Sequence, residues 1–431
     1  MEIPKSSAKY WMLFLIFSGN AINALDRSSL AFANTFIAKD LNLSMTTMGM
    51  VMSAFGWAYL LGNLPAGRLC DRFGEKKVYG LGAILWSFAS AATGLAKGVG
   101  VLLVSRVLIG VGESANFPAA TKVITERFDK SQRGMATGVF MAGLRVGFAI
   151  TPALMIGLML AFGSKANPNW HIAFYVTGLG SLLWVALWFL TYRDKAGSSV
   201  QPSAAPSLKV RIPLMVLLKY RNTWAMICVK FCQDYLYYLF LTWLPGYLVR
   251  ARHLDLGKVV FYSTMPWIAG MVTQPLIGII ADKMINSGLD ATKVKKSLLV
   301  LMQVVSLAVV FAGFAQSAVV AAWLLVLAMA GESACSALTW TIPQDLSPKG
   351  MSGTLGGVNN TSGAVASIAA PVITGFVAQH FGFQFALAFG GALTVVGILC
   401  VLFMMTTLRP LPIDTALYQG ADKVAGAAAN G

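Results

Sequence analysis

Twelve apolar stretches, each about 20 residues long or longer, limit what this chain can fold into more than any other feature of the sequence. An α-helix needs about 20 mostly apolar residues to cross the hydrocarbon core of a bilayer. Backbone polar groups in that core must be hydrogen-bonded within the protein, so a series of such stretches predicts spanning helices. We therefore expect an all-α membrane protein with twelve transmembrane helices, at 11–34, 46–66, 78–97, 100–121, 134–160, 170–192, 222–248, 258–281, 297–315, 318–340, 353–378 and 383–406.

A polar segment divides the twelve stretches into two sets of six. Residues 193–221 combine charged residues with Ser, Gly and Pro and have no apolar period, which is typical of a flexible linker. We expect a six-helix bundle at 1–192, this linker on the cytoplasmic side, a second six-helix bundle at 222–407 and a cytoplasmic tail at 408–431.

The two sets of six also repeat one another. The tetrapeptide GESA occurs at 112–115 and again at 331–334, and Pro152 is matched by Pro371, so both pairs are 219 residues apart. Two pseudo-symmetric halves are typical of secondary transporters, whose site lies between the halves near the middle of the bilayer.

The charges are few and unevenly placed. Only 12% of the residues are charged, about half the share of a soluble protein, which argues against a cytosolic enzyme. The 33 Lys and Arg residues outnumber the 17 Asp and Glu residues, and most of them fall in the loops on the side of the two chain ends. Basic loops stay in the cytoplasm. We predict an integral membrane protein, in a bacterial inner membrane, with cytoplasmic termini and a basic surplus that faces lipid and not nucleic acid.

Sequence features of catalysis are weak. His171, His253 and His380 are scattered and have no metal-ligand spacing, and no phosphate-cradling glycine pattern suggests a nucleotide site. We therefore expect no enzyme activity, no metal and no cofactor other than a proton as coupling ion. A sensor that kept a transporter fold stays open as an alternative.

One loop motif resembles a known family. The segment 67–77 reads GRLCDRFGEKK, and a weaker copy, GIIADK, stands at 278–283. Both resemble the signature loops of the major facilitator superfamily, and the resemblance implies that family's fold. In that family these loops brace the cytoplasmic gate, so the resemblance assigns a gating role to Gly67, Asp71, Arg72 and Asp282.

Four further segments resemble the anion:cation symporter branch of that family. They are LDRSSLA at 25–31, SAFGWAY at 53–59, GESANFP at 112–118 and LTWLP at 241–245. The branch includes proton-coupled transporters of galactonate, glucarate, hexuronates and some aromatic carboxylates. The similarity extends from the first apolar stretch to the twelfth.

Eight charged residues fall inside the apolar stretches. A charge at the centre of a spanning helix costs about 2.5–3.5 kcal/mol on insertion scales, so each is a candidate functional residue. Arginine stays charged and offers a bidentate fork to a carboxylate. The four bases are Arg27, Arg106, Arg145 and Lys230, and the four acids are Asp26, Glu113, Asp234 and Glu332.

The resemblance and the spacing suggest roles for these charges. In the resembled branch, arginines at the positions of Arg27 and Arg106 contact substrate or neighbouring carboxylates, and the carboxylates at Asp26 and Glu113 carry protons. Arg106 and Glu113 are seven residues apart, about two helical turns, which places both on one helix face. A carboxyl group that moves between an arginine and an apolar environment changes its proton affinity. A purely structural, charge-neutralising role for each arginine remains the alternative.

The second half gives weaker assignments. Glu332 stands at the position in the second half that Glu113 has in the first. Unlike Glu113, it has no basic residue seven positions earlier, so a structural role and a proton-carrying role are equally open. Asp234 follows Lys230 by four residues, which predicts an intrahelical ion pair. Other polar and aromatic side chains in expected cavity-lining helices complete the substrate-binding candidates, with helix packing as their alternative: Tyr59, Gln233, Trp340, Asn359 and Asn360.

Departures from the branch bear on the substrate. Ala24 stands where sugar-acid members usually have tyrosine, Leu144 and Arg145 where a glutamine is usual, and Lys230 where another glutamine is expected. We expect a monomeric proton-coupled symporter that imports a small organic carboxylate, such as an aldarate, aldonate or hexuronate, by alternating access. The extra cations leave aromatic acids, other dicarboxylates or sulfonates open as substrates, and anion exchange remains open as the transport mode.

Overall fold

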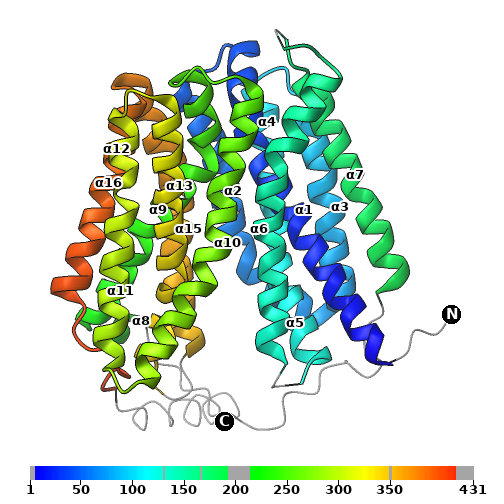
Figure 1. The fold of residues 1–431 in the computed structure, drawn as a ribbon. Coiled ribbons are helices and arrows are strands. Elements are labelled where there is room, and N and C mark those ends of the chain that lie inside the picture. Colours follow the sequence, from blue (N-terminus) through cyan, green and yellow to red (C-terminus); the bar gives the residue numbers. More distant parts are fainter. Residues whose placement is uncertain (1–4, 130–131, 166, 193–213, 349–351, 414–431) are drawn as a thin grey trace.

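A computed structural model describes residues 5–129, 132–165, 167–192, 214–348 and 352–413. The described chain is built of helices that run up and down a single bundle (Figure 1). Those of the first half are α1 (Lys5–Asp40), α2 (Met45–Phe73), α3 (Glu75–Thr93), α4 (Val99–Glu113), α5 (Asn116–Arg127), α6 (Arg133–Ala161) and α7 (Trp170–Thr191).

The second half follows the same plan after a short helix. Its elements are α8 (Leu214–Leu217), α9 (Arg221–Arg250), α10 (Leu256–Asn286), α11 (Ala291–Ser306), α12 (Ala308–Phe314), α13 (Ala318–Thr339), α14 (Ile342–Leu346), α15 (Ser352–His380), α16 (Phe383–Leu399) and the π-helical turn η1 (Cys400–Met404).

Four of the expected passes are each made of two consecutive elements. They are α4 with α5, α11 with α12, α13 with α14, and α16 with η1. With each pair taken as one pass, the described helices match the twelve expected spans. Eight passes are long and apolar enough to cross a membrane on composition alone. Among the other four, α1 and α9 contain the buried charges and amides described below.

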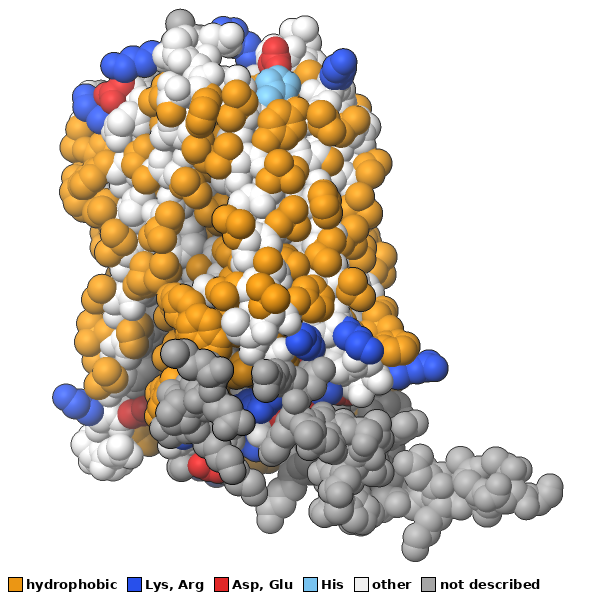
Figure 2. All heavy atoms as spheres, turned by 90° about the vertical axis from the view of Figure 1, so that its right-hand side faces the viewer, with side chains coloured by type: hydrophobic (Ala, Val, Ile, Leu, Met, Phe, Trp, Pro, Cys, Tyr) orange, Lys and Arg blue, Asp and Glu red, His pale blue; other side chains and the backbone are white. Residues whose placement is uncertain are grey.

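The surface suits a bilayer. Figure 2 shows one face of the bundle, on which hydrophobic side chains cover the middle and charged side chains gather at the two ends. Large apolar side chains are exposed on the bundle; in α7, for example, Leu183 is 77% exposed and Leu190 is 81% exposed. An exposed apolar belt of this kind is stable in lipid, where no water contacts it.

The two ends of the bundle are named after the ends of α1. We call the end where α1 begins the Lys5 end and the end where α1 finishes the Asp40 end.

Glycines bring the two halves close together towards the Asp40 end. A Cβ on Gly49 of α2 would collide with the backbone of Pro371 in α15, and one on Gly375 of α15 would lie 2.7 Å from the carbonyl oxygen of Met45. Small residues let helix backbones approach within a membrane. The α2–α15 contact is therefore a tight seam between the halves.

The signature segments are helical, which corrects the expectation of open loops. Helix α2 continues to Phe73, and only Gly74 departs from it, with a φ of 84° that favours glycine. Gly67 lies inside α2, and a Cβ there would meet nothing within 4 Å, so neither a tight turn nor close packing explains this residue. The second copy, 278–283, lies within α10, which continues to Asn286.

A buried carboxylate anchors the first signature segment. The Tyr192 hydroxyl donates to Glu75 Oε1 at 2.6 Å, and Lys122 Nζ lies 3.2 Å from Glu75 Oε2. Lys122 also donates to the carbonyl oxygen of Cys70 at 2.9 Å. These contacts join the junction of α2 and α3 to α5 and to the end of α7. The sequence analysis did not select Glu75, because nothing in the sequence distinguishes it from the other charged residues of the segment 67–77.

Two expected segments are only partly described. Residues 193–213 of the expected linker and 414–431 of the expected tail lie outside the described residues. Within the linker range, α8 is helical and not irregular. The start of the tail is held in place, because Leu408 N–H donates to Thr292 Oγ1 at 3.2 Å and Leu411 N–H donates to the carbonyl oxygen of Leu346 at 2.9 Å.

Candidate functional site

A polar cavity of about 450 Å³ lies between the two halves. Its volume is in the range of small-molecule sites, about 300–1,000 Å³. The lining residues come from both halves: Arg27, Tyr59, Asn63, Phe117, Met141, Leu144, Arg145, Lys230, Asp234, Tyr237, Tyr238, Gln274, Glu332, Ser336, Trp340, Gly356, Gly357, Asn360, Gly363 and Ala364.

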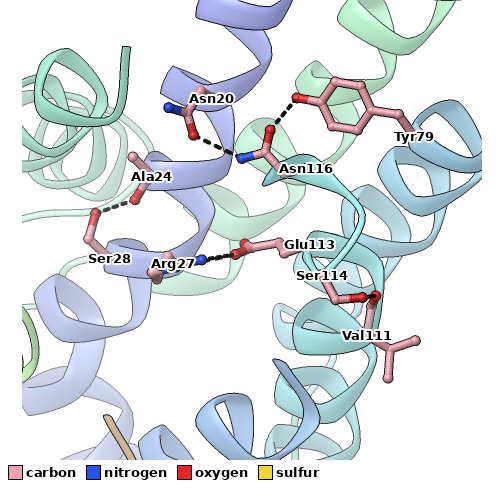
Figure 3. A network of polar contacts seen from close by, with 9 residues as sticks. All are labelled: Asn20, Ala24, Arg27, Ser28, Tyr79, Val111, Glu113, Ser114 and Asn116. Carbon is pink, nitrogen blue, oxygen red and sulfur yellow. Dashed lines mark hydrogen bonds and ion pairs between the residues drawn. The ribbon is translucent and has the colours of Figure 1, made fainter. Parts of the chain in front are cut away.

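Arg27 and Glu113 form the ion pair of the first half (Figure 3). Arg27 of α1 donates to Glu113 Oε2 from Nε at 3.3 Å and from Nη2 at 3.1 Å. Glu113 is the last residue of α4 and is fully buried, whereas Arg27 also lines the cavity. The guanidinium lies over the rings of Phe55 and Tyr59, at 4.8 and 4.9 Å. Arginine thus connects the buried carboxylate to the cavity wall.

Asp26 faces away from its neighbour Arg27. Ser90 donates to Asp26 Oδ1 at 2.7 Å, and Ser181 donates to Oδ2 at 3.4 Å. The carboxyl group is fully buried between α1, α3 and α7 and is absent from the cavity lining. Any proton that reaches Asp26 must therefore pass through other groups.

Arg106 shares α4 with Glu113, as its spacing suggested, but it does not hydrogen-bond to that carboxylate. The hydrogen bonds to Glu113 come from Arg27, although Arg106 stands two turns before Glu113 on the same helix. Arg106 is 2% exposed, and its Nε and Nη2 atoms have no hydrogen-bond partner within the described chain. It lines a much smaller space, of about 30 Å³, beside Arg27. Its charge therefore lies behind the cavity wall.

An amide chain supports this side of the site (Figure 3). Tyr79 donates to Asn116 Oδ1, and Asn116 Nδ2 donates to Asn20 Oδ1, both at 2.8 Å. Asn20 Nδ2 in turn donates to the carbonyl oxygen of Phe140 at 2.7 Å. The chain joins α1, α3, α5 and α6, so it fixes the position of the helix break that follows Glu113.

Lys230 and Asp234 form the ion pair of the second half. Lys230 Nζ lies 2.8 Å from Asp234 Oδ1, which confirms the predicted intrahelical pair. Both residues line the cavity, and the ammonium lies 4.9 Å from the centre of the Trp340 ring. The pair therefore presents charge and an aromatic surface to the same space.

Glu332 is held by neutral partners. Gln233 Nε2 donates to Glu332 Oε1 at 3.1 Å, and Ser333 Oγ donates to Oε2 at 3.2 Å. Thr339 Oγ1 donates to the other end of the Gln233 amide at 2.6 Å. Glu332 lines the cavity, whereas Gln233 lies behind it. Gln233 is thus placed to orient Glu332.

Arg145 crosses from one half to the other. It belongs to α6, yet its Nη2 donates to Gln274 Oε1 of α10 at 2.9 Å and its Nη1 donates to Ser333 Oγ of α13 at 3.4 Å. Unlike Arg27 and Lys230, it has no carboxylate within 4 Å among the described residues. Arg145 therefore brings a positive charge to the cavity that no described ion pair neutralises.

The remaining candidates differ in their access to the cavity. Tyr59, Trp340 and Asn360 line it, whereas Asn359 is fully buried elsewhere and its amide has no partner within the described chain. Sequence reasoning missed Gln274, although it is an amide in an apolar stretch, the signal used for the others. Two neighbouring tyrosines of α9, Tyr237 and Tyr238, also line the cavity, whereas Tyr235 bonds to Thr374 instead.

Hydrogen bonds between the halves are confined to part of the bundle. Apart from those of Arg145, the described cross-half bonds join Thr46 to Gln379, Arg250 to Thr35, and Thr264 to the carbonyl oxygen of Ala149. All of these lie at the level of the cavity or nearer the Asp40 end. The cavity lining, in contrast, extends towards the Lys5 end through Trp340 and Gly357. Within the described chain, side-chain hydrogen bonds thus join the halves on one side of the cavity only.

Two helical halves, an apolar belt and a charged central cavity define a membrane transporter and not an enzyme. Comparison with protein families agrees, because the model of the Major Facilitator Superfamily matches residues 16–371. The chain belongs to this superfamily and is an integral membrane protein. A solved bacterial homolog of the human lysosomal transporter Spinster, in an inward-facing and occupied conformation, has the same fold: the TM-score is 0.80 at 16% identity, over 96% of this chain and 100% of that one.

Curated relatives match over almost their whole length. A probable galactarate/D-glucarate transporter of Bacillus subtilis (strain 168) is 30% identical, over 94% of this chain and 93% of the relative. A D-galactonate transporter of Escherichia coli O6:H1 is 29% identical, over 95% and 99%. A probable sulfoacetate transporter of Cupriavidus necator is 30% identical, over 88% and 90%. All three relatives are named as transporters of small organic anions.

Proposed function

We propose that this protein is a proton-coupled symporter that imports a sugar acid by alternating access. The names of relatives that cover nearly the whole chain support a sugar-acid substrate. The cavity suits such a substrate, because it offers cations for a carboxylate and amides and tyrosines for hydroxyl groups. Its aromatic wall, Trp340, suits the carbon chain.

One observation supports this function more than any other: Arg145 places in the cavity a cation that has no described carboxylate within 4 Å, and it is linked to Glu332 only through the Ser333 hydroxyl. A charge in such a site is costly unless it is paired, so an anionic ligand would stabilise it. We assign direct substrate contacts to Arg145, Lys230, Tyr59, Trp340 and Asn360. Arg106, Gln233 and Asn359 lie behind the lining and act through their neighbours.

Proton coupling is proposed to act through the Arg27–Glu113 pair. A proton on Glu113 neutralises the carboxylate that holds the guanidinium, and Arg27 then becomes available to the substrate carboxylate. One proton and one negative charge enter the site together, so the site's net charge is unchanged. Asp26, buried next to Arg27, is assigned as a second proton carrier.

Alternating access requires the cavity to open at each end in turn. We propose that the described conformation opens at the Lys5 end, which we assign to the cytoplasm of a bacterium because the basic loops gather there. The segments with Gly67, Asp71, Arg72 and Asp282 are assigned to the cytoplasmic gate. All three charged residues of this set are exposed at helix ends, where a gate contact could form and break. The transport unit is proposed to be one chain.

Uptake into proteoliposomes tests the proposal. The purified protein would be given an inward proton gradient and radiolabelled galactarate, galactonate, a hexuronate or an aromatic acid in turn. We expect the gradient to drive accumulation of a sugar acid, and Glu113→Gln to abolish accumulation while counterflow exchange continues. Exchange that ignores the gradient in both proteins would show an exchanger and refute the proton roles.

A dicarboxylate other than a sugar acid, or a sulfonate, is the second candidate substrate. The unpaired Arg145 and the presence of Lys230 favour a ligand with more than one anionic group, and one relative is named as a probable sulfoacetate transporter. Competition against the labelled substrate decides between the candidates. Stronger binding of a gluconate-like monoacid than of dicarboxylates or sulfoacetate would rule this candidate out.

A further inference from the structure

A second, larger groove lies on the outside of the bundle, away from the central cavity. It has a volume of about 900 Å³ and runs between α11 and the end of the α16–η1 pass. At the Lys5 end it is lined by Lys293, Lys296 and Arg409, together with the hydroxyls of Thr406 and Thr407. Further into the membrane its wall is apolar and consists of Val300, Leu301, Val304 and Leu402.

Within the described chain, no ion pair neutralises the basic charge of this groove. No described carboxylate lies within 4 Å of Lys293, Lys296 or Arg409, whereas the adjacent Lys295 pairs with Asp345. Lys296 donates one hydrogen bond to the carbonyl oxygen of Met405, and its ammonium group has two further N–H donors. The groove's single acid, Asp290, caps α11 by accepting from the backbone N–H of Lys293. The groove therefore has a net positive charge.

The apolar wall continues directly from the cations along one face of α11. Lys293, Lys296, Val300 and Val304 follow one another at three- and four-residue intervals, which places them on one helix face. From residue 293 to residue 304 the helix rises about 16 Å. This distance is about half of a 30 Å hydrocarbon core, or one leaflet. Leu301 and Val304 are 53% and 50% exposed, so a chain in the groove would cover them.

We propose that this groove binds one anionic phospholipid. Its phosphate contacts Lys293, Lys296 and Arg409, and one acyl chain lies along Val300, Leu301 and Val304. Basic pockets between helices on the cytoplasmic side attract anionic head groups, and the groove lies at the end assigned to that side. The π-helical turn η1 widens the end of the pass and places Leu402 on the groove wall. The lipid would bridge α11 to the segment that follows η1, whatever substrate the cavity takes.

Native mass spectrometry of the full chain tests the proposal. The first phosphatidylglycerol bound to the detergent-purified protein would be titrated in the parent protein and in a Lys293→Gln/Arg409→Gln double variant. Each basic residue near a lipid surface contributes roughly fivefold in affinity, so the double variant is expected to bind about thirtyfold more weakly. A Lys77→Gln/Lys283→Gln variant removes two charges at the same end of the bundle and should bind as the parent does.

Further arms separate a lipid from its parts. Leu301→Asn/Val304→Asn should also weaken binding, since it disrupts the acyl groove without changing charge. Phosphatidylcholine with the same chains should bind weakly, and inorganic phosphate should not displace phosphatidylglycerol. The proposal is overturned if the Lys293/Arg409 variant binds as tightly as the parent. It is equally overturned if the Lys77/Lys283 control loses as much affinity, or if inorganic phosphate competes as well as the lipid.

Discussion

Replacement of Arg145 by glutamine is the most informative perturbation of the central site. Arg145→Gln removes the cavity cation that has no described carboxylate partner but keeps a polar side chain of similar reach. The present hydrogen-bond partners are neutral: Gln274 at 2.9 Å and Ser333 at a long 3.4 Å. Because the donor is charged, the loss of these bonds also costs free energy, and a Gln274→Met variant measures the larger part of that cost. The diagnostic loss is the additional one in the complex with an anion.

The size of this loss follows from the kind of bond. A hydrogen bond to a charged group contributes about 1.5–3 kcal/mol, which corresponds to a 10- to 150-fold weaker affinity. If Arg145 holds the second anionic group of a diacid, that loss applies to galactarate and hardly to galactonate, whose single carboxylate we assign to Arg27. The ratio of the two affinities is therefore the diagnostic quantity.

Isothermal titration of both acids into the detergent-purified protein measures that ratio. Gln274→Met is the matched control, because it removes the cross-half acceptor but keeps the guanidinium, so it reports the conformational part of the effect alone. Equal losses for galactarate and galactonate in Arg145→Gln would refute the assignment of a second anion site. Equal losses in Arg145→Gln and Gln274→Met would show instead that Arg145 acts only as a connection between the halves.

Three other perturbations have defined outcomes. Glu75→Gln removes the ion pair with Lys122 and should destabilise the first half by about 1–3 kcal/mol, seen as a lower thermal midpoint in detergent; an unchanged midpoint would mean that the anchor contributes nothing. Gly49→Leu places atoms against the Pro371 backbone, so the Asp40 end should stay open. A cysteine introduced into the same variant by Met52→Cys should then react with an impermeant maleimide added from that side. Gly157→Leu, where a Cβ meets nothing within 4 Å, should leave that cysteine protected. Asn359→Leu removes a buried amide without a described partner and should lower uptake without lowering the thermal midpoint; a lower midpoint would indicate a structural role.

The sequence was sufficient to predict the fold because the bilayer imposes simple rules on it. Apolar length predicted the helices, and the repeat of GESA predicted two halves. The Lys230–Asp234 pair was also predictable, since both residues lie one turn apart on one helix. Such features depend on local spacing alone.

The pairing of the other charges could not be predicted, because it depends on contacts between helices and not on local spacing. Arg27 and Glu113 are 86 residues apart, and only the folding of the first half, in which α1 packs mainly on α6, brings the two side chains together. Spacing placed Arg106 on the helix face of Glu113, but it could not show that Arg27, on another helix, donates the hydrogen bonds to that carboxylate. In the same way, the contact of Arg145 with Gln274 depends on how the two halves meet. Sequence spacing determines which residues share a helix face, but it contains no information on the neighbouring helix.

Each half keeps its own ion pair, and this arrangement affects how fast the halves can move. Arg27 pairs with Glu113 inside the first half, and Lys230 pairs with Asp234 inside the second. Breaking a buried ion pair costs about 3–5 kcal/mol, which would slow a step by roughly two to four orders of magnitude if it had to occur on the way. A rigid-body rotation of one half against the other breaks neither pair. The charged side chain that such a rotation does have to release is Arg145, which bonds to Gln274 and Ser333 of the other half. Movement between the halves is therefore opposed by one cation with neutral partners and not by two buried ion pairs.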